Sequence, residues 1–242
     1  MRLLILRQPL HKFMRSCINS TEFHTLKSLI FFTIALLSMA VSSAVYAASY
    51  AYITNQGSND VSVIDVKTDK VIATIPVGKS PVGIAIAPKF SRAFVSNVDG
   101  RSISVIDTSS HKVINELPID GSPVGLALSP DNSRLYVADW FDDRIIEIDI
   151  ATPDSRREVS IGKAPAGMVV SPDGKHLYVA NRDSDDVAVI ETASLKAVSR
   201  IPVGKHPFGI AISHDGSSLY VVNVQDNSLT VVDLQRNTSS KI

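Results

Sequence analysis

Apolar and polar positions follow one another along this chain in a pattern that repeats every 42 residues. The clearest element is an apolar run that begins with an aromatic residue and ends in Asn or Asp. It occurs five times, beginning at Tyr52, Phe94, Tyr136, Tyr178 and Tyr220. A second apolar run, which ends in an acidic residue, keeps the same step and begins at Val61, Ile103, Ile145, Val187 and Leu229. Five registers without an insertion indicate one structural unit of constant length.

Four strands, here named a to d, fit within one unit, as residues 165–203 illustrate. Apolar runs at 166–172, 175–181 and 187–191 are separated by polar turns, and a fourth, more polar run ends near Pro202 and Gly204. Pro and Gly recur too often for a helix of about ten residues. The first two runs are almost continuously apolar, which is typical of strands buried on both faces, whereas the fourth alternates as an outer edge strand does.

Four antiparallel strands in a unit of 42 residues are typical of one β-propeller blade. A single blade has two apolar faces, so neighbouring blades must cover each other, which explains why the unit is repeated. We therefore predict an all-β fold, a β-propeller built from 42-residue four-stranded blades. The alternative is a solenoid or stacked sandwich, but the antiparallel unit is too long for one coil of a β-helix.

The repeats resemble the YVTN β-propeller family, whose strand-b motif is found here as "YITN", "YVAN" and "YVVN". The segment 61–88 is very similar to the consensus of that family, and the resemblance extends over residues 50–234. It implies about seven blades. It does not select a function, because propellers of this family occur in surface-layer proteins, in secreted bacterial proteins and in accessory proteins near periplasmic oxidoreductases.

The chain holds fewer blades than the resemblance implies. It contains strands b, c and d, then three complete units, then strands a, b and c, which makes 18 strands or about four and a half blades. These two ends do not complete one blade together. We expect a propeller that is incomplete or open relative to a seven-bladed ring, with end blades that expose sticky edges and associate with other copies.

The first 47 residues differ from the rest and predict a signal peptide over 1–47, followed by a repeat domain over 48–242. A basic lead is followed by a 13-residue apolar core at 29–41 and then by small residues, with cleavage expected after Ala47. The core is shorter than the ~20 residues that span a bilayer. We expect a periplasmic or secreted bacterial protein without a membrane span in its mature chain; the alternative is an uncleaved anchor.

Removal of this segment changes both charge and cysteine content. The chain has 24 basic and 24 acidic residues, and loss of five bases and one acid leaves 19 against 23. A weakly acidic domain does not favour nucleic acid as a partner. Cys17, the one cysteine, leaves with the signal. Disulfides, thiol nucleophiles, haem attachment and cysteine metal sites are therefore not expected in the mature chain.

Candidate binding residues lie in the loops that join strand b to strand c and strand d to the next strand a. Both kinds of loop lie on one side of a propeller, here called the top face. The d–a loops place Lys79, Lys163 and Lys205 at one register, where they would form a partial basic ring for an anionic ligand. The alternative is that Gly and Pro shape the turn and that the lysines are solvated consensus residues.

Two further features depart from the repeat. Trp140 and Phe141 form an aromatic pair in one b–c loop, which suits a partner or ligand anchor, unless the rings fold onto an adjacent blade. His206 and Phe208 replace small residues in the last d–a loop. His206 could act as a base or metal ligand, but the equivalent loops offer Ser or Ala and no converging ligands.

No catalytic or cofactor motif is recognisable, so we expect no cofactor and no metal. The sequence favours a non-catalytic binding or scaffold protein that acts through its top-face loops on an unidentified protein or small anionic ligand. A first alternative is a propeller lactonase-type hydrolase, whose chemistry needs a metal held by carboxylates where this chain has lysines. A second is an accessory protein of a periplasmic quinone- or haem-dependent oxidoreductase.

Overall fold

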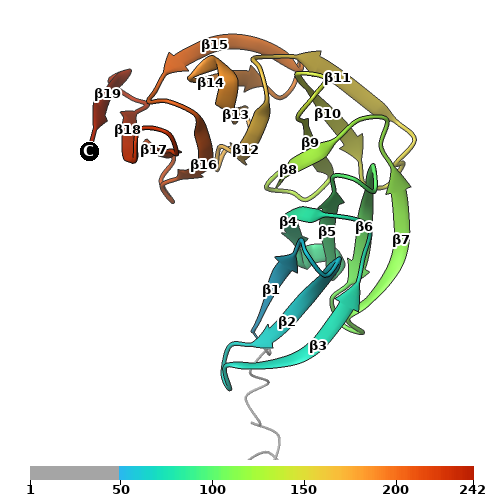
Figure 1. The fold of residues 1–242 in the computed structure, drawn as a ribbon. Coiled ribbons are helices and arrows are strands. Elements are labelled where there is room, and N and C mark those ends of the chain that lie inside the picture. Colours follow the sequence, from blue (N-terminus) through green and yellow to red (C-terminus); the bar gives the residue numbers. More distant parts are fainter. Residues whose placement is uncertain (1–48) are drawn as a thin grey trace, which may run out of the picture. The chain divides into compact units, whose positions relative to one another are not determined.

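The computed structural model describes residues 49–242, which belong to one compact unit (Figure 1). Its strands form antiparallel sheets in which each strand pairs with the next along the chain. Each sheet matches one repeat and is called a blade, numbered from 1 to 5 in chain order. The sequence prediction of an all-β propeller of four-stranded blades is confirmed.

The strand boundaries follow the repeat closely. Blade 1 contains β1 (Tyr50–Asn55), β2 (Asp60–Asp65) and β3 (Lys70–Pro76). Blade 2 contains β4 (Pro81–Ala87), β5 (Arg92–Asn97), β6 (Ser102–Asp107) and β7 (Lys112–Pro118), with a 3₁₀ turn η2 at Pro88–Phe90. Blade 3 contains β8 (Pro123–Leu128), β9 (Arg134–Asp139), β10 (Arg144–Asp149) and β11 (Arg156–Ser160). Blade 4 contains β12 (Pro165–Val170), β13 (His176–Asn181), β14 (Asp186–Glu191) and β15 (Lys196–Pro202), with η3 at Arg182–Ser184. Blade 5 contains β16 (Pro207–Ile212), β17 (Ser218–Asn223), β18 (Ser228–Asp233) and β19 (Thr238–Lys241).

The last blade corrects the predicted count of 18 strands, because it has a fourth strand. β19 pairs with β18 from Asp233↔Thr238 to Thr230↔Lys241. In the turn between β18 and β19, the backbone N–H groups of Gln235 and Arg236 donate hydrogen bonds to the Asp233 carboxylate, at 3.0 and 2.9 Å. The strand itself is polar and exposed, and it needs only backbone pairing to form. Within the described residues, blade 1 alone lacks an inner strand.

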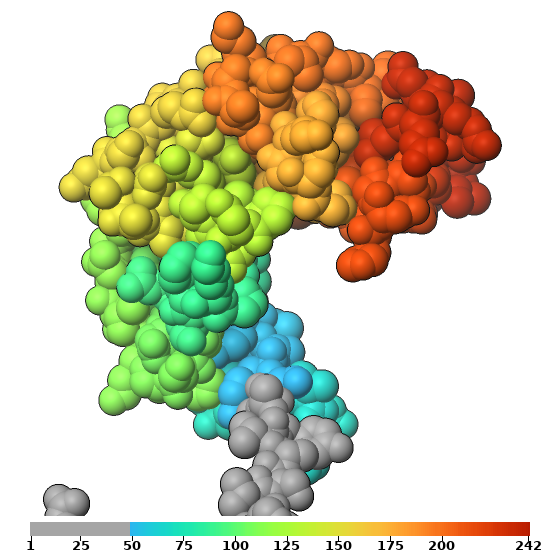
Figure 2. Space-filling view, turned by 180° about the vertical axis from the view of Figure 1, so that it is seen from behind, coloured from blue at the N-terminus to red at the C-terminus, as the bar shows by residue number. Residues whose placement is uncertain are grey.

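The core lies between the blades rather than within them. Tyr178 and Val189 of blade 4, for example, pack against Leu219 and Val221 of blade 5. Inner strands β4, β8, β12 and β16 contact one another in that order. Figure 2 shows the blades in contact in sequence order, while blades 1 and 5 do not meet. Apolar burial between neighbours therefore stabilises each blade, as the repeat predicts.

A glycine in each of the inner strands β4, β8 and β12 permits the close approach of the next inner strand. A β-carbon at Gly83 would overlap the carbonyl oxygen of Val124, and one at Gly125 would overlap that of Ala166. Gly167 has the same relation to the carbonyl oxygen of Phe208. The Pro-x-Gly motif of the repeat is therefore a packing requirement of adjacent blades.

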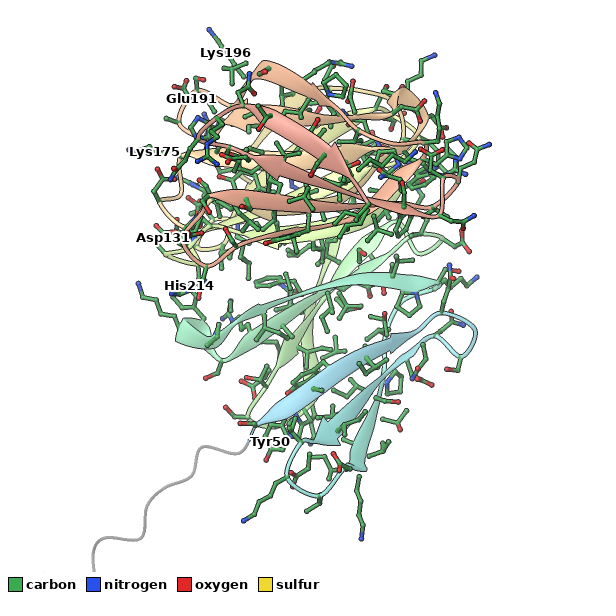
Figure 3. The ribbon with its side chains drawn as sticks, turned by 90° about the vertical axis from the view of Figure 1, so that its left-hand side faces the viewer. Tyr50, Asp131, Lys175, Glu191, Lys196 and His214 are labelled. Atoms are coloured by element: carbon green, nitrogen blue, oxygen red, sulfur yellow. The ribbon has the colours of Figure 1, made fainter. Side chains whose placement is uncertain are left out.

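The turns separate onto two faces. Figure 3 labels Asp131, Lys175 and His214 from a–b turns, together with Glu191 and Lys196 at the c–d turn of blade 4, along one side of the molecule. This side is called the bottom face. The b–c and d–a loops, which carry the predicted binding residues, lie at the opposite strand ends and form the top face.

Candidate binding site on the top face

The d–a loops are held in place by the b–c loop of the preceding blade. In three of them the residue before Pro has a positive φ of 51–54°, and its backbone N–H donates to an Asn or Asp side chain. The pairs are Ser80 with Asn59 (2.8 Å), Ala164 with Asp143 (2.8 Å) and His206 with Asp185 (2.9 Å). These hydrogen bonds fix the position of each loop. They also hold the residue before Pro, which is not glycine, in the left-handed conformation.

The three lysines of the predicted basic ring are exposed, but they do not share one environment. Lys205 Nζ lies 2.5 Å from Asp185 Oδ2. The hydrogen bond to this carboxylate raises the pKa of Lys205 and lowers the pKa of Asp185. Among the ion pairs of residues 49–242, neither Lys79 nor Lys163 takes part. Lys79 and Lys163, in the loops that lead into blades 2 and 4, therefore carry the positive charge at this register. The charge of Lys205 is offset by Asp185.

Two sequence candidates that lie far apart in the chain meet on this face. The rings of Trp140 and Phe208 have centroids 6.1 Å apart and an interplanar angle of 56°. Trp140 begins the b–c loop of blade 3, where its backbone N–H donates to Ser122 O at 3.1 Å. Phe208 is the second residue of β16 in blade 5. Blade 4 has the small Ala166 at the register of Phe208.

Arg182 completes this group from blade 4. Its guanidinium carbon lies 5.8 Å from the centroid of the Trp140 ring, within cation–π range. Its backbone N–H donates to Ala164 O at 3.1 Å, and its Nη1 donates to Asp183 Oδ1 at 2.6 Å. Trp140, Arg182 and Phe208 are called the Trp140 cluster. They come from three consecutive blades, and none of them recurs in the other repeats.

The sequence suggested that Trp140 and Phe141 either form an exposed anchor or fold onto an adjacent blade, and the two residues differ in this respect. Trp140 folds onto the neighbouring blades, whereas the Phe141 side chain is 74% exposed. Phe208 also keeps an exposed face. The top face thus offers an exposed ring at Phe141 and a partly exposed ring at Phe208, which contacts Trp140, and this suits a planar apolar group.

His206 contributes its backbone to the loop, and its side chain is half-buried. In residues 49–242, no three His, Cys, Asp or Glu side chains gather where they could hold a metal ion. That part of the chain also has no helix long and apolar enough to cross a bilayer.

A polar cleft on the bottom face was missed by the sequence reasoning. It has a volume of about 390 Å³ between blades 3 and 4, and Arg134, Tyr136, Glu147, Asp173 and Thr192 line it. Glu147 stands where the other four repeats have Val63, Val105, Val189 and Val231. The replacement of valine by Glu147 is the feature of the sequence that could have indicated this cleft.

Glu147 is 3% exposed and forms a two-pronged ion pair with Arg157, with Nε–Oε1 and Nη2–Oε2 distances both of 2.9 Å. Arg157 also donates to the carbonyl oxygens of Thr192 (3.3 Å) and Ala193 (3.2 Å), which belong to the c–d turn of blade 4. Burial and the nearby Glu147 carboxylate raise the pKa of Tyr136 to about 12. The arrangement links two blades through a buried carboxylate.

Comparison with known proteins supports the fold over part of the chain. The family described as "Lactonase, 7-bladed beta-propeller" matches residues 146–240. The PE-PGRS family protein PE_PGRS18 of Mycobacterium tuberculosis is 49% identical over 45 residues, which are 19% of this chain and 10% of that protein. The matched segment is thus a small part of this curated relative.

Solved structures share the architecture at low identity. A functionally unknown protein from Desulfotomaculum acetoxidans has a TM-score of 0.69 and 21% identity, over 80% of this chain and 65% of that one. A catalytically inactive virginiamycin B lyase from Staphylococcus aureus, solved with quinupristin, has a TM-score of 0.69 and 17% identity, over 81% and 66% of the two chains. The dihydro-heme d1 dehydrogenase NirN has a TM-score of 0.63 and 18% identity, over 83% and 46%. This chain spans about two thirds or less of these structures, and likeness at such identity shows the fold alone: the protein is a β-propeller, incomplete in the described residues.

Proposed function

We propose that this protein is a non-catalytic β-propeller that binds a partner through the Trp140 cluster on its top face. The supporting observation is the convergence of three residues that are foreign to the repeat. Residues that every blade needs for packing recur at equivalent registers of a repeat protein. Trp140, Arg182 and Phe208 do not recur, yet they meet across three blades. Binding to a ligand explains such a group better than packing does.

The chemistry of the cluster points to one class of partner. Aromatic rings and an arginine are the side chains that most often anchor binding surfaces. Phe141 and Phe208 supply exposed apolar area. Lys79 and Lys163 supply positive charge on the same face, whereas Asp183 offsets the charge of Arg182. The partner we propose is a protein segment or small anion that presents a planar apolar group next to a carboxylate or similar anionic group.

We propose that the protein binds its partner outside the cytoplasm, as a periplasmic or secreted protein. The basic, apolar and small-residue order of residues 1–47 supports export through a cleaved signal peptide, but it lies outside the described residues. The strand-b motifs support membership of the YVTN group of exported propellers. N-terminal sequencing of protein from the cell-envelope fraction tests export: we expect Ala48 as the first residue, and a chain that keeps Cys17 would contradict it.

The binding proposal is tested with paired proteins. Immobilised wild-type protein and an Arg182→Ala/Phe208→Ala variant are incubated with envelope extract, and candidates retained only by the wild type are purified. Each is then titrated directly, with emission from Trp140, the single tryptophan, as the readout. We expect saturable binding that the double variant loses and that a Val198→Ser variant on β15 keeps. Equal binding by all three proteins would contradict a role for the cluster.

A lactonase-type hydrolase is the second candidate, and the lactonase family match over residues 146–240 favours it. The two candidates differ in turnover. We expect purified protein to hydrolyse lactone substrates no faster than buffer. Activity that disappears with a chelator and returns with a divalent cation would support the hydrolase instead.

A further inference from the structure

An apolar pocket lies between blades 2 and 3, two interior blades that have neighbours on both sides. Its volume is about 220 Å³. Arg92 at the start of β5 and Pro153 in the β10–β11 turn both line it, so the pocket lies toward the bottom face, at the opposite end of the strands from the Trp140 cluster. Five buried apolar side chains form most of its wall: Phe94, Val105, Leu117, Leu135 and Ile148.

The outer strand of blade 2 leaves this pocket unbridged. At blade 3, Arg157 of β11 donates to the carbonyl oxygens of Thr192 and Ala193 in the next blade. Asn115 of β7 stands at the register of Arg157 and lines the pocket. It is exposed, and its Oδ1 accepts a hydrogen bond from the backbone N–H of Glu116 at 2.8 Å. Blades 2 and 3 are therefore not joined by a side chain at this register, and the wall beside Asn115 faces solvent.

Arg92 is the one charged residue among those that line the pocket. It is half-buried, and it pairs across the strands with Asp107 of β6. At the same registers of blade 3, Arg134 forms an ion pair with Asp149. Among the ion pairs of residues 49–242, Arg92 takes part in none. Its guanidinium thus stands at an apolar pocket without a carboxylate bound to it.

The Asp107 carboxylate is engaged by its own turn instead. Its Oδ1 accepts hydrogen bonds from the backbone N–H of Ser109 at 3.2 Å and from the backbone N–H and hydroxyl of Ser110, both at 2.7 Å. The Ser110 hydroxyl lowers the pKa of Asp107 most, and the charge of Arg92 adds a smaller part. Arg92 therefore lies near a carboxylate but keeps its N–H donors for another acceptor, and a second carboxylate can accept two of them side by side.

The size of the pocket limits what it can hold. A cavity of ~150 Å³ lined by Leu, Ile and Phe holds one benzene molecule, whereas sites for drug-sized ligands span roughly 300–1,000 Å³. At about 220 Å³, this pocket suits a short alkyl chain or a substituted phenyl ring. Burial of that group against the apolar wall would supply affinity, and Arg92 would select an anionic end.

We propose that the pocket between blades 2 and 3 binds a small carboxylate that has an apolar body. The body lies against Phe94, Leu135 and Ile148, and the carboxylate accepts hydrogen bonds from Arg92. This site is separate from the Trp140 cluster, so it stands or falls independently of the function proposed above.

Isoleucine methyl signals in NMR spectra test the site, because Ile114, Ile148 and Ile150 line the pocket. Hexanoate is titrated into methyl-labelled protein, with hexan-1-ol as a neutral probe of the same length, and single Ile→Val substitutions assign the signals. We expect hexanoate to shift the three pocket signals saturably. The signal of Ile190, the register equivalent of Ile148 in blade 4, should not move. Hexan-1-ol should bind about tenfold more weakly, because it lacks the charged hydrogen bonds to Arg92.

A pair of variants separates the role of Arg92 from general effects of charge. Arg92→Gln should weaken hexanoate binding by about tenfold, to the level of hexan-1-ol. Arg134→Gln is the matched control, because it removes the same charge at the same register of blade 3, and it should bind hexanoate like the wild type. The methyl spectrum shows whether each variant is folded, and if Arg92→Gln is not, the two probes on the wild type still decide. Absence of shifts at the pocket signals, equal binding of the two probes, or unchanged affinity in folded Arg92→Gln would overturn the proposal.

Discussion

The indole ring of Trp140 lies 6.1 Å from the phenyl ring of Phe208, although the two residues are 68 positions apart in the sequence and belong to blades 3 and 5. Their contact bridges blade 4, which contributes Arg182 beside the indole ring. The cluster therefore exists only when three blades have their native spacing. Its single tryptophan reports on that spacing and on anything that binds there.

The first prediction concerns the environment of Trp140. Phe208→Ala removes a ring partner and exposes more of the indole to water, so we expect its emission to shift to longer wavelength and its quenching by iodide to increase. Phe141→Ala is the control, because Phe141 is already exposed and contacts no ring among the described residues. An emission spectrum that responds equally to both substitutions would show that the Trp140–Phe208 contact does not persist in solution.

Much of the fold could be predicted because packing requirements recur in the sequence. Tyr136 and Tyr178 are the third residues of the equivalent strands β9 and β13, and both are buried against the next blade. β19 was missed because Thr238–Lys241 is polar and exposed, so no apolar pattern marks it. Its pairing depends on backbone hydrogen bonds with β18, which any residue except proline can form.

The candidate site was less predictable, because which side chains from different blades meet depends on how the blades pack. Trp140 and Phe208 were each visible as departures from the repeat, but their contact depends on how blades 3, 4 and 5 pack together. Arg182 also differs from the residues at its register, but that register varies among the repeats, so the difference did not stand out. Glu147 did depart from four valines, yet its meaning depends on a partner, Arg157, on the adjacent strand. A residue that breaks a repeat can be found in sequence, whereas its partner requires the structure.

The second prediction compares two glycines of the same motif. Gly125→Ala should lower the free energy of unfolding by about 1–3 kcal/mol, because the added methyl group overlaps the carbonyl oxygen of Ala166 in the next inner strand. Gly209→Ala should have little effect, because its nearest neighbour is a Val222 side-chain carbon at 3.7 Å from the β-carbon position. Urea unfolding followed by circular dichroism measures both. Equal losses would mean that these glycines serve the strand conformation rather than the approach of a neighbouring blade.

The third prediction concerns acid stability. Hydrogen bonds from the side chain of Ser129 and from Ser133 lower the pKa of Asp131 to about 2, and bonds from Ser213 and Ser217 do the same for Asp215. In the unfolded chain an Asp titrates near ~3.9. The unfolded state therefore takes up protons first as the pH falls, so the stabilisation is complete above about pH 4 and is lost as the pH falls through about 2.

Thermal unfolding between these pH values checks the sign. We expect the midpoint of the wild type to fall over this interval. An Asp131→Asn/Asp215→Asn variant should start lower at neutral pH and change less with acid. Asp154→Asn, at an exposed position, is the control and should follow the wild type. A double variant with the full wild-type pH dependence would show that other carboxylates govern acid unfolding.

The last prediction separates the two halves of the buried ion pair. Arg157→Ala leaves the Glu147 carboxylate buried without its partner, so the free energy of unfolding should fall by about 2–3 kcal/mol, less than for a fully buried pair because Arg157 is itself half exposed. Arg157→Ala combined with Glu147→Val restores the valine found in the other four repeats and removes the charge. We expect the double variant to recover most of the loss, because an apolar side chain at this position packs without a desolvation cost. Urea unfolding of the single and double variants measures the difference. If the double variant stayed as unstable as Arg157→Ala, the bonds from Arg157 to the turn of blade 4, rather than the charge on Glu147, would account for the loss.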